Sequence, residues 1–402
     1  MASIFCPIFK STRRGPGPCG RALVLGLVLW IGAVAPAAAQ EGFPGAPDEG
    51  AVNLRVYPTD VWGPRVGVGV GLGLVGHGLA RAADRWLLTA APARREQVGT
   101  LSFASADPRR ARRYVLVTTR ALHTDRDWAG PWSVARSGIR GRVRYGHTFL
   151  DRRLLVQPHV SVLSTTIDDV RRRDGASAAA PPSPGQTGLR AGLDLRYRVG
   201  ARRGGLGPSA TLQGTWARYA AVDGSGLQFD RIDLEAYGTL SLTGRHRLRL
   251  RAHGTLTDNR SETPLPLYLQ PVLGGTVAPG WARAQFVGPD RVLGSLLYRF
   301  PLFTLGRSTV VGGHLGTHVG AVYRDLGTQF APRVRFDEAG PASTALRPSA
   351  SAGLQFTVPF RPRAAVDLAV GVSPGGVTAT RVTFTRRLQA LRFPHHTADP
   401  PR

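Results

Sequence analysis

Arginines at every second position are the most prominent charged feature of this sequence. In residues 138–149, Arg140, Arg142 and Arg144 alternate with apolar residues that include Ile139 and Val143. Further arginines at this spacing are Arg190, Arg196, Arg198, Arg247, Arg249 and Arg251. Guanidinium groups bind phosphates and other anions, and they form ion pairs with acids on a neighbouring strand. We expect these arginines to line a watery interior, with Asp233 and Glu235 as cross-strand acids.

Histidine is the residue most often used in acid–base catalysis. The histidines at positions 77, 123, 147, 159, 246, 253, 314 and 318 are scattered singly, and only His395 and His396 are adjacent. A lipid hydrolase needs a nucleophile and a base in reach of each other, and the sequence shows no such pair. We therefore expect no catalytic residue, no metal site and no cofactor, with His147 on the apolar side of its strand and His253 on the polar side.

The glycines between positions 67 and 73 lack the helix start and the lysine of a phosphate-binding loop. They are more typical of a strand with a bare inner face, which allows another segment to approach closely.

The first 39 residues have the features of a secretory signal peptide. Lys10, Arg13, Arg14 and Arg21 precede an apolar run that ends in three alanines, which predicts cleavage before Gln40. Cys6 and Cys19 lie in this part, so the mature chain is expected to have no thiol. Residues 40–50 are then a short N-terminal segment, and residues 389–402 form a C-terminal tail.

The chain of 402 residues carries a formal net charge of +26, or 26 − 4 = +22 without the four basic residues of the signal segment. A strongly basic protein usually meets nucleic acid or an anionic membrane surface. Because an exported protein seldom meets nucleic acid, we expect outer-membrane lipid, including lipopolysaccharide, as the surroundings, and no nucleic-acid partner.

Alternation of apolar and polar residues, which is typical of β-strands, recurs throughout the rest of the chain. We expect about 16 strands, near residues 51–57, 64–75, 84–93, 96–105, 112–123, 137–149, 154–167, 188–199, 209–220, 227–243, 246–257, 290–303, 308–323, 349–360, 364–373 and 377–388. Long polar linkers, at residues 170–187, 258–289 and 324–348, contrast with turns such as the one at 150–153. Short turns on one side and long loops on the other indicate an outer-membrane barrel.

A soluble two-sheet sandwich would show a similar alternation. A signal peptide followed by sixteen strands without a domain break favours a closed barrel, because closure leaves no unpaired strand edge in lipid. We therefore predict an all-β protein with a single 16-stranded antiparallel transmembrane barrel over residues 51–388. Since a midplane arginine facing lipid costs about 2–4 kcal/mol, the arginines must face the lumen.

The segment PLPLYLQPVLGGTVAPGWARAQFVGPDRVLGSLLYRFPLF, at 264–303, resembles the BamA/TamA bacterial surface antigen family. The resemblance is diffuse elsewhere, but covers nearly the whole mature chain. It implies a 16-stranded barrel that inserts or translocates other proteins through a seam between its first and last strands. It also implies a long loop, here about 258–289, that folds back into the barrel. Too few residues precede the first strand for a periplasmic POTRA domain, so the chain resembles a POTRA-less member.

The loop departs from the family pattern. Where the family has Arg-Gly-Phe/Tyr, this chain has Pro279-Gly280-Trp281, with Arg283 two residues later. The aspartate of the family's wall motif is also absent, since the aligned residues are Gly316-Thr317-His318. The usual salt bridge between loop and wall cannot form, and we expect Gly280 and Trp281 to dock the loop by aromatic packing.

Three functions follow from these features. The resemblance implies protein assembly, insertion or translocation at the bacterial outer membrane, with client barrel proteins or a periplasmic partner that supplies the missing domains. A passive pore for anions or small solutes, lined by arginines, is the alternative. An outer-membrane lipid-modifying enzyme has the weakest support.

Overall fold

The computed structural model describes residues 52–58, 61–62, 70–77, 84–92, 96–106, 111–172, 184–200, 208–243, 246–275, 278–282, 284–305, 309–336, 345–358 and 364–386. The predicted signal peptide, the segment 40–50 and the tail 389–402 lie outside these ranges and stay predictions.

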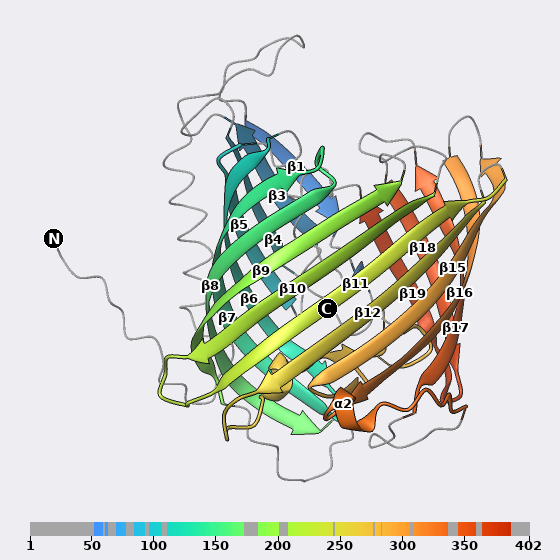
Figure 1. Ribbon diagram of the computed structural model, residues 1–402. Coiled ribbons are helices and arrows are strands. Elements are labelled where there is room, and N and C mark those ends of the chain that lie inside the picture. The colour runs from blue at the N-terminus through green and yellow to red at the C-terminus, as the bar shows by residue number, and fades with distance from the viewer. Residues whose placement is uncertain are drawn as a thin grey trace.

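Strands make up most of the described chain, and they join in one antiparallel sheet that curves into a barrel-shaped wall (Figure 1). Its strands are β1 (Val52–Pro58), β2 (Val61–Trp62), β3 (Val70–His77), β4 (Arg85–Pro92), β5 (Glu96–Ala104), β6 (Arg113–Ala129), β7 (Trp132–Phe149), β8 (Leu154–Arg172), β9 (Gln186–Gly200), β10 (Ser209–Ala221), β11 (Gln228–Ser241), β12 (Arg247–Asn259), β15 (Asp290–Leu305), β16 (Thr309–Tyr323), β17 (Arg347–Val358), β18 (Ala364–Ser373) and β19 (Gly376–Arg386). The all-β fold class is therefore confirmed, with sixteen strands and the two-residue β2 in the described part of the sheet.

Neighbouring strands pair in chain order from β3 to β19 apart from the loop strands β13 and β14, so each pair forms a hairpin. At the two ends of this series, β1 pairs with β3, whereas β2 pairs with β19. The β2–β19 contact consists of two residue pairs, Trp62 with Val382 and Val61 with Thr383. Among the residues that the structure describes, β2 and β19 thus share fewer residue pairs than any other neighbouring strands of this sheet.

The strands differ from the predicted segments mainly at one end of the wall. The β6–β7 hairpin continues to a turn at Gly130 and Pro131, and β8 extends to Arg172. Alternation fails there because a bulge between Thr124 and Asp127 shifts the register, and because both faces of a strand can be polar beyond the membrane. Residues 64–69, which the sequence assigned to the second strand, lie outside the described ranges.

The three long linkers all lie at the same end of the barrel, because antiparallel neighbours reverse direction at every connection. They join β8 to β9, β12 to β15 and β16 to β17, and α2 (Leu326–Gln329) in the third linker marks this end at the bottom of Figure 1. The linker between β12 and β15 contains the 3-10 helix η1 (Leu267–Leu269) and a hairpin of β13 (Val272–Leu273) and β14 (Phe286–Val287). We call residues 260–289 the inner loop.

Candidate functional site: the inner wall and its docked loop

The two faces of β7 differ sharply in exposure. Ile139, Val143 and Phe149 on one face are 49%, 50% and 43% exposed, whereas Arg142 and Arg144 on the other are 7% and 3% exposed. Apolar exposed residues are expected where a wall faces lipid. The outer surface is therefore the apolar one, and the arginines point inward.

The predicted lumen residues share this inner face on neighbouring strands. Arg140, Arg142 and Arg144 lie on β7, Arg190, Arg196 and Arg198 on β9, Asp233 and Glu235 on β11, and Arg247, Arg249 and Arg251 on β12. Arg198, Arg247 and Arg249 are exposed, whereas Arg196 is buried. This arrangement gives the inner wall a strongly basic stretch from β7 to β12.

The acids of β11 reach β12 in two different ways. Arg251 Nε donates to Glu235 Oε1 over 2.6 Å, and Thr255 Oγ1 donates to Asp233 Oδ1 over 2.8 Å. Arg249 instead lies over the Tyr237 ring, 5.8 Å from its centroid. Among the described residues, neither Arg247 nor Arg249 has an acid within ion-pair distance. Of these three β12 arginines, Arg251 is therefore the one that pairs with a predicted acid.

Asp194 is an inner-wall acid that the sequence did not single out. Its Oδ2 lies 3.8 Å from Arg144 Nε and 3.5 Å from His159 Nδ1, and its Oδ1 accepts a 2.8 Å hydrogen bond from Thr215. The alternating stretch LDLR, at 193–196, placed Asp194 on the polar face of its strand, and that was the available signal. Its partners on β7, β8 and β10 are visible only when the strands are paired.

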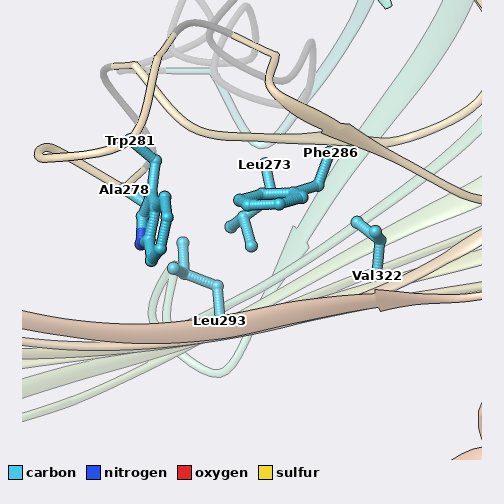
Figure 2. Close-up of a cluster of buried hydrophobic side chains, with 6 residues drawn as sticks. All are labelled: Leu273, Ala278, Trp281, Phe286, Leu293 and Val322. Carbon is cyan, nitrogen blue, oxygen red and sulfur yellow. The ribbon is translucent and has the colours of Figure 1, made fainter. Parts of the chain in front are cut away.

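The inner loop is anchored to the wall by a buried apolar cluster. Leu273, Ala278, Trp281 and Phe286 of the loop pack against Leu293 of β15 and Val322 of β16 (Figure 2). Trp281 is 3% exposed, and its ring meets that of Phe286 edge to face with centroids 5.2 Å apart. Removing such side chains from water supplies most of the docking energy.

The turn before Trp281 fits against a part of the wall that has small side chains. Gly280 has φ +105°, and a Cβ at this position would lie 2.4 Å from the Val372 carbonyl oxygen of β18. Ser373 Oγ donates a 2.7 Å hydrogen bond to the Gly280 carbonyl oxygen. A Cβ on Gly371 would in turn lie 2.1 Å from Gly280 N, so glycine is needed on both sides of this contact. Arg283, the third predicted loop residue, lies outside the described residues.

Arginines of the wall hold the rest of the inner loop. Arg231 Nη2 donates to the Leu269 carbonyl oxygen over 2.6 Å, and Arg291 Nη1 donates to the Val272 carbonyl oxygen over 2.7 Å. The guanidinium carbon of Arg347 on β17 lies 3.9 Å from the centroid of the Phe286 ring, and Arg347 is 2% exposed. In these three contacts the cations belong to the wall, and the loop supplies carbonyl oxygens and an aromatic face.

The opposite side of the inner loop contacts β7 and the linker before β9. Arg136 of β7 lies over the Tyr268 ring, and the Tyr268 hydroxyl donates to the Pro184 carbonyl oxygen over 3.1 Å. Burial raises the pKa of this phenol, so it stays a neutral donor. Leu265 packs with Tyr219, Leu227 and Phe229. The loop therefore crosses the interior from β7, β10 and β11 to β15–β18.

The residues aligned with the family's wall motif do not bond to the loop in this arrangement. His318 contacts Ser295 Oγ through Nδ1 and Ser351 Oγ through Nε2, both at 3.0 Å. These contacts link β16 to β15 and β17 within the wall. The cation of Arg347, one strand further on, provides the contact with the loop instead.

Within the described ranges, no helix is long and apolar enough to span a membrane. The same residues contain no group of three or more side chains that is suited to a metal ion.

Comparisons with known proteins find similar solved structures but no matching sequence. No family model and no curated protein matches the chain. Among solved structures, BamA from Haemophilus ducreyi lacking POTRA domains 1–3 matches with a TM-score of 0.59 at 12% identity, over 84% of this chain and 70% of that one. CdiB from Escherichia coli matches with a TM-score of 0.58 at 16% identity, over 86% of this chain and 64% of that one.

These similarities confirm the fold expected from the resemblance. The chain has the barrel architecture of the BamA and CdiB structures, which are bacterial outer-membrane-type barrels. It spans somewhat less than two thirds of the length of the Escherichia coli CdiB chain.

Proposed function

We propose that this protein is a bacterial outer-membrane barrel that inserts or translocates other proteins. Its likeness in fold to BamA and CdiB supports this class of activity. The exposed apolar belt supports a place in a lipid bilayer, with outer-membrane lipid and lipopolysaccharide around the wall. The proposed activity moves a polypeptide and needs no catalytic residue.

The docked inner loop is the observation that carries the proposal. It crosses the interior and contacts both sides of the wall through Tyr268, Trp281 and Phe286. A segment anchored across the lumen narrows the path that a freely diffusing solute would need. A barrel that inserts other proteins must open between two of its strands. A loop docked inside the barrel can hold the remaining strands in register while those two strands separate.

The short contact between β2 and β19 supports a client path through the wall. Within the described ranges, two residue pairs join these strands, whereas β18 and β19 are joined by nine. Backbone pairs dominate the cohesion of a sheet in lipid, because unpaired groups cost several kcal/mol each. Separation of these strands would break the fewest of the backbone pairs that the described residues form, and it would expose strand edges that a client strand can pair with. Client barrel proteins, and a periplasmic partner that delivers them, are the partners we propose.

A passive anion pore is the second candidate, and the arginines on the inner faces of β7, β9 and β12 favour it. Its distinguishing property is a stable anion-selective conductance in planar bilayers that falls when Arg140, Arg142 and Arg144 are replaced. If the barrel instead inserts or translocates other proteins, we expect little conductance while the inner loop is docked.

Depletion of this protein in its own host tests the proposed function. We expect the outer-membrane levels of one or more other barrel or secreted proteins to fall at least severalfold, with their unfolded forms accumulating in the periplasm, measured by quantitative proteomics of isolated outer membranes. A plasmid copy of the wild-type chain should restore these levels. Unchanged levels of every other outer-membrane protein after complete depletion would refute the proposal.

A further inference from the structure

The outer face of the β6–β7 hairpin brings together three residues that the sequence did not connect. His123 on β6 is directly opposite Ser137 on β7, and Asp125 lies two residues further along β6, in the bulge between Thr124 and Asp127. His123 Nδ1 lies 2.8 Å from Ser137 Oγ, and His123 Nε2 lies 3.1 Å from Asp125 Oδ1. The expectation that no histidine had a nucleophile in reach was therefore wrong for His123, since strand pairing closes a gap of fourteen residues.

We propose that Ser137, His123 and Asp125 form a nucleophilic catalytic site that hydrolyses carboxylic esters of membrane lipids. A nucleophile hydrogen-bonded to a base, which is itself oriented by an acid, is the arrangement that activates serine in hydrolases. This activity is separate from the proposed function, and it rests only on the outer face of the barrel meeting lipid.

The contacts determine which nitrogen of His123 can act as the base. A carboxylate only accepts hydrogen bonds, so Asp125 Oδ1 holds the proton of a neutral imidazole on Nε2. Nδ1 is then the unprotonated nitrogen, and it faces the Ser137 hydroxyl. This is the tautomer that can take the serine proton during attack.

The place of Ser137 on the wall identifies the substrate class. The exposed apolar residues of β7 run from Ile139 to Phe149, and ten steps of about 3.3 Å at a tilt of about 40° span about 25 Å, the height of a barrel's apolar belt. Ser137 follows directly on this outer face, two residues beyond Ile139. The ester groups of lipids lie at this boundary between acyl chains and headgroups. The side chains of His123 and Asp125 are 35% and 55% exposed, so the site is open to a lipid from the side.

The reaction consumes one water molecule and one ester. Ser137 Oγ attacks the acyl carbonyl carbon while His123 Nδ1 takes the hydroxyl proton, and the C–O bond to the lipid alcohol then breaks as His123 returns the proton to that oxygen. Water attacks the acyl-serine in the same way, which releases the fatty acid and restores the Ser137 hydroxyl. No oxidant, metal or other cofactor is required.

Asp168 on β8 provides a control for the role of Asp125, because it is a second acid near Ser137. Its Oδ2 lies 3.2 Å from Ser137 Oγ, so it competes with His123 for the same hydroxyl proton. Its negative charge also opposes the oxyanion that forms when Ser137 attacks. Asp168→Asn should therefore keep or raise the hydrolytic rate, whereas Asp125→Asn should lower it because the imidazole loses the group that fixes its tautomer.

The test uses the purified full chain in detergent micelles with two substrates, a diacyl phosphatidylethanolamine and lipid A, and measures released fatty acid by mass spectrometry. We expect release from at least one lipid, a fall of at least a hundredfold in Ser137→Ala and His123→Ala, and a fall of about tenfold to a hundredfold in Asp125→Asn. Comparison of the two substrates identifies the source of the ester. Each variant must keep the heat-modifiable electrophoretic mobility of the folded barrel.

Covalent labelling gives a readout that does not depend on the natural substrate. A fluorophosphonate with an acyl tail should modify the wild-type chain at Ser137, as located by peptide mass spectrometry, and should not modify His123→Ala. The proposal is overturned if neither lipid releases more fatty acid with the wild-type chain than with Ser137→Ala and Ser137 takes no label. Such a result would leave the proposed function untouched.

Discussion

Trp281→Ala is expected to release the tip of the inner loop from the wall. The indole is 3% exposed between Phe286 and the wall residue Leu293, and truncation of a buried tryptophan costs about 3–5 kcal/mol. Each 1.4 kcal/mol is a factor of ten in an equilibrium, so the undocked loop should become at least a hundredfold more populated. Because the strands of the wall pair independently of the loop, the barrel itself should stay folded.

A reporter cysteine at Ala278, which is 1% exposed in the docked loop, measures the release of the tip. Maleimide labelling of Ala278→Cys should be slow in the otherwise wild-type chain and at least a hundredfold faster when Trp281→Ala is added. Trp281→Phe is the matched control, since it keeps an aromatic ring and removes an indole N–H that has no hydrogen-bond partner among the described residues. Equal labelling rates in all three backgrounds would show that Trp281 does not hold the loop.

Arg347→Gln is expected to weaken the same docking from the side of the wall. A desolvated guanidinium over an aromatic face contributes about 2 kcal/mol or more, and Arg347 lies over Phe286 at 3.9 Å while almost fully buried. The same labelling assay should therefore show a rate about thirtyfold higher. Arg347→Lys should fall between the two, because an ammonium group keeps the charge but not the flat stacking surface.

Arg249→Gln is the matched control for Arg347→Gln. Arg249 also lies over an aromatic ring, that of Tyr237, but the contact is longer, at 5.8 Å, and Arg249 is exposed and belongs to the wall alone. It should leave the labelling of the loop unchanged. If Arg249→Gln speeds labelling as much as Arg347→Gln does, the effect comes from the loss of positive charge inside the barrel and not from the contact between Arg347 and Phe286.

Much of the wall could be predicted because its pattern is local. In a barrel each strand has one face in lipid and one inside, so every strand such as β7 or β9 repeats the period-two alternation in its own residues. The predicted and observed ranges agree closely for β9, β10 and β12. The hairpin of β13 and β14 was not predicted, because its four paired residues lie in a loop and carry no period of their own.

The site was less predictable because its contacts are not local. Gly280 and Trp281 were identified through the family resemblance, but Arg231, Arg291 and Arg347 were not, since nothing near them in sequence marks them as partners of the loop. Their roles depend on which inner positions of β11, β15 and β17 face the loop. The contact between His123 and Ser137 was hidden in the same way, because it exists only in the register of β6 with β7.

We propose that client chains pass through the seam between β2 and β19. The most direct test of this path is a disulfide across that seam, Trp62→Cys with Val382→Cys, at directly paired positions. Opposite residues of antiparallel strands have Cα atoms about 4.5–5.5 Å apart, within reach of a disulfide. The matched control is Trp216→Cys with Ile232→Cys, a directly opposed pair on the outer face of β10 and β11. Signal cleavage is expected to leave no native cysteine to interfere.

The measurement is the rate at which these proteins, reconstituted in liposomes, insert the client barrel identified by depletion. A client path through this seam predicts that the oxidised seam pair loses at least tenfold in insertion rate and regains it on reduction, while the oxidised control pair inserts the client at the wild-type rate. Insertion at the wild-type rate through a fully oxidised seam would contradict it.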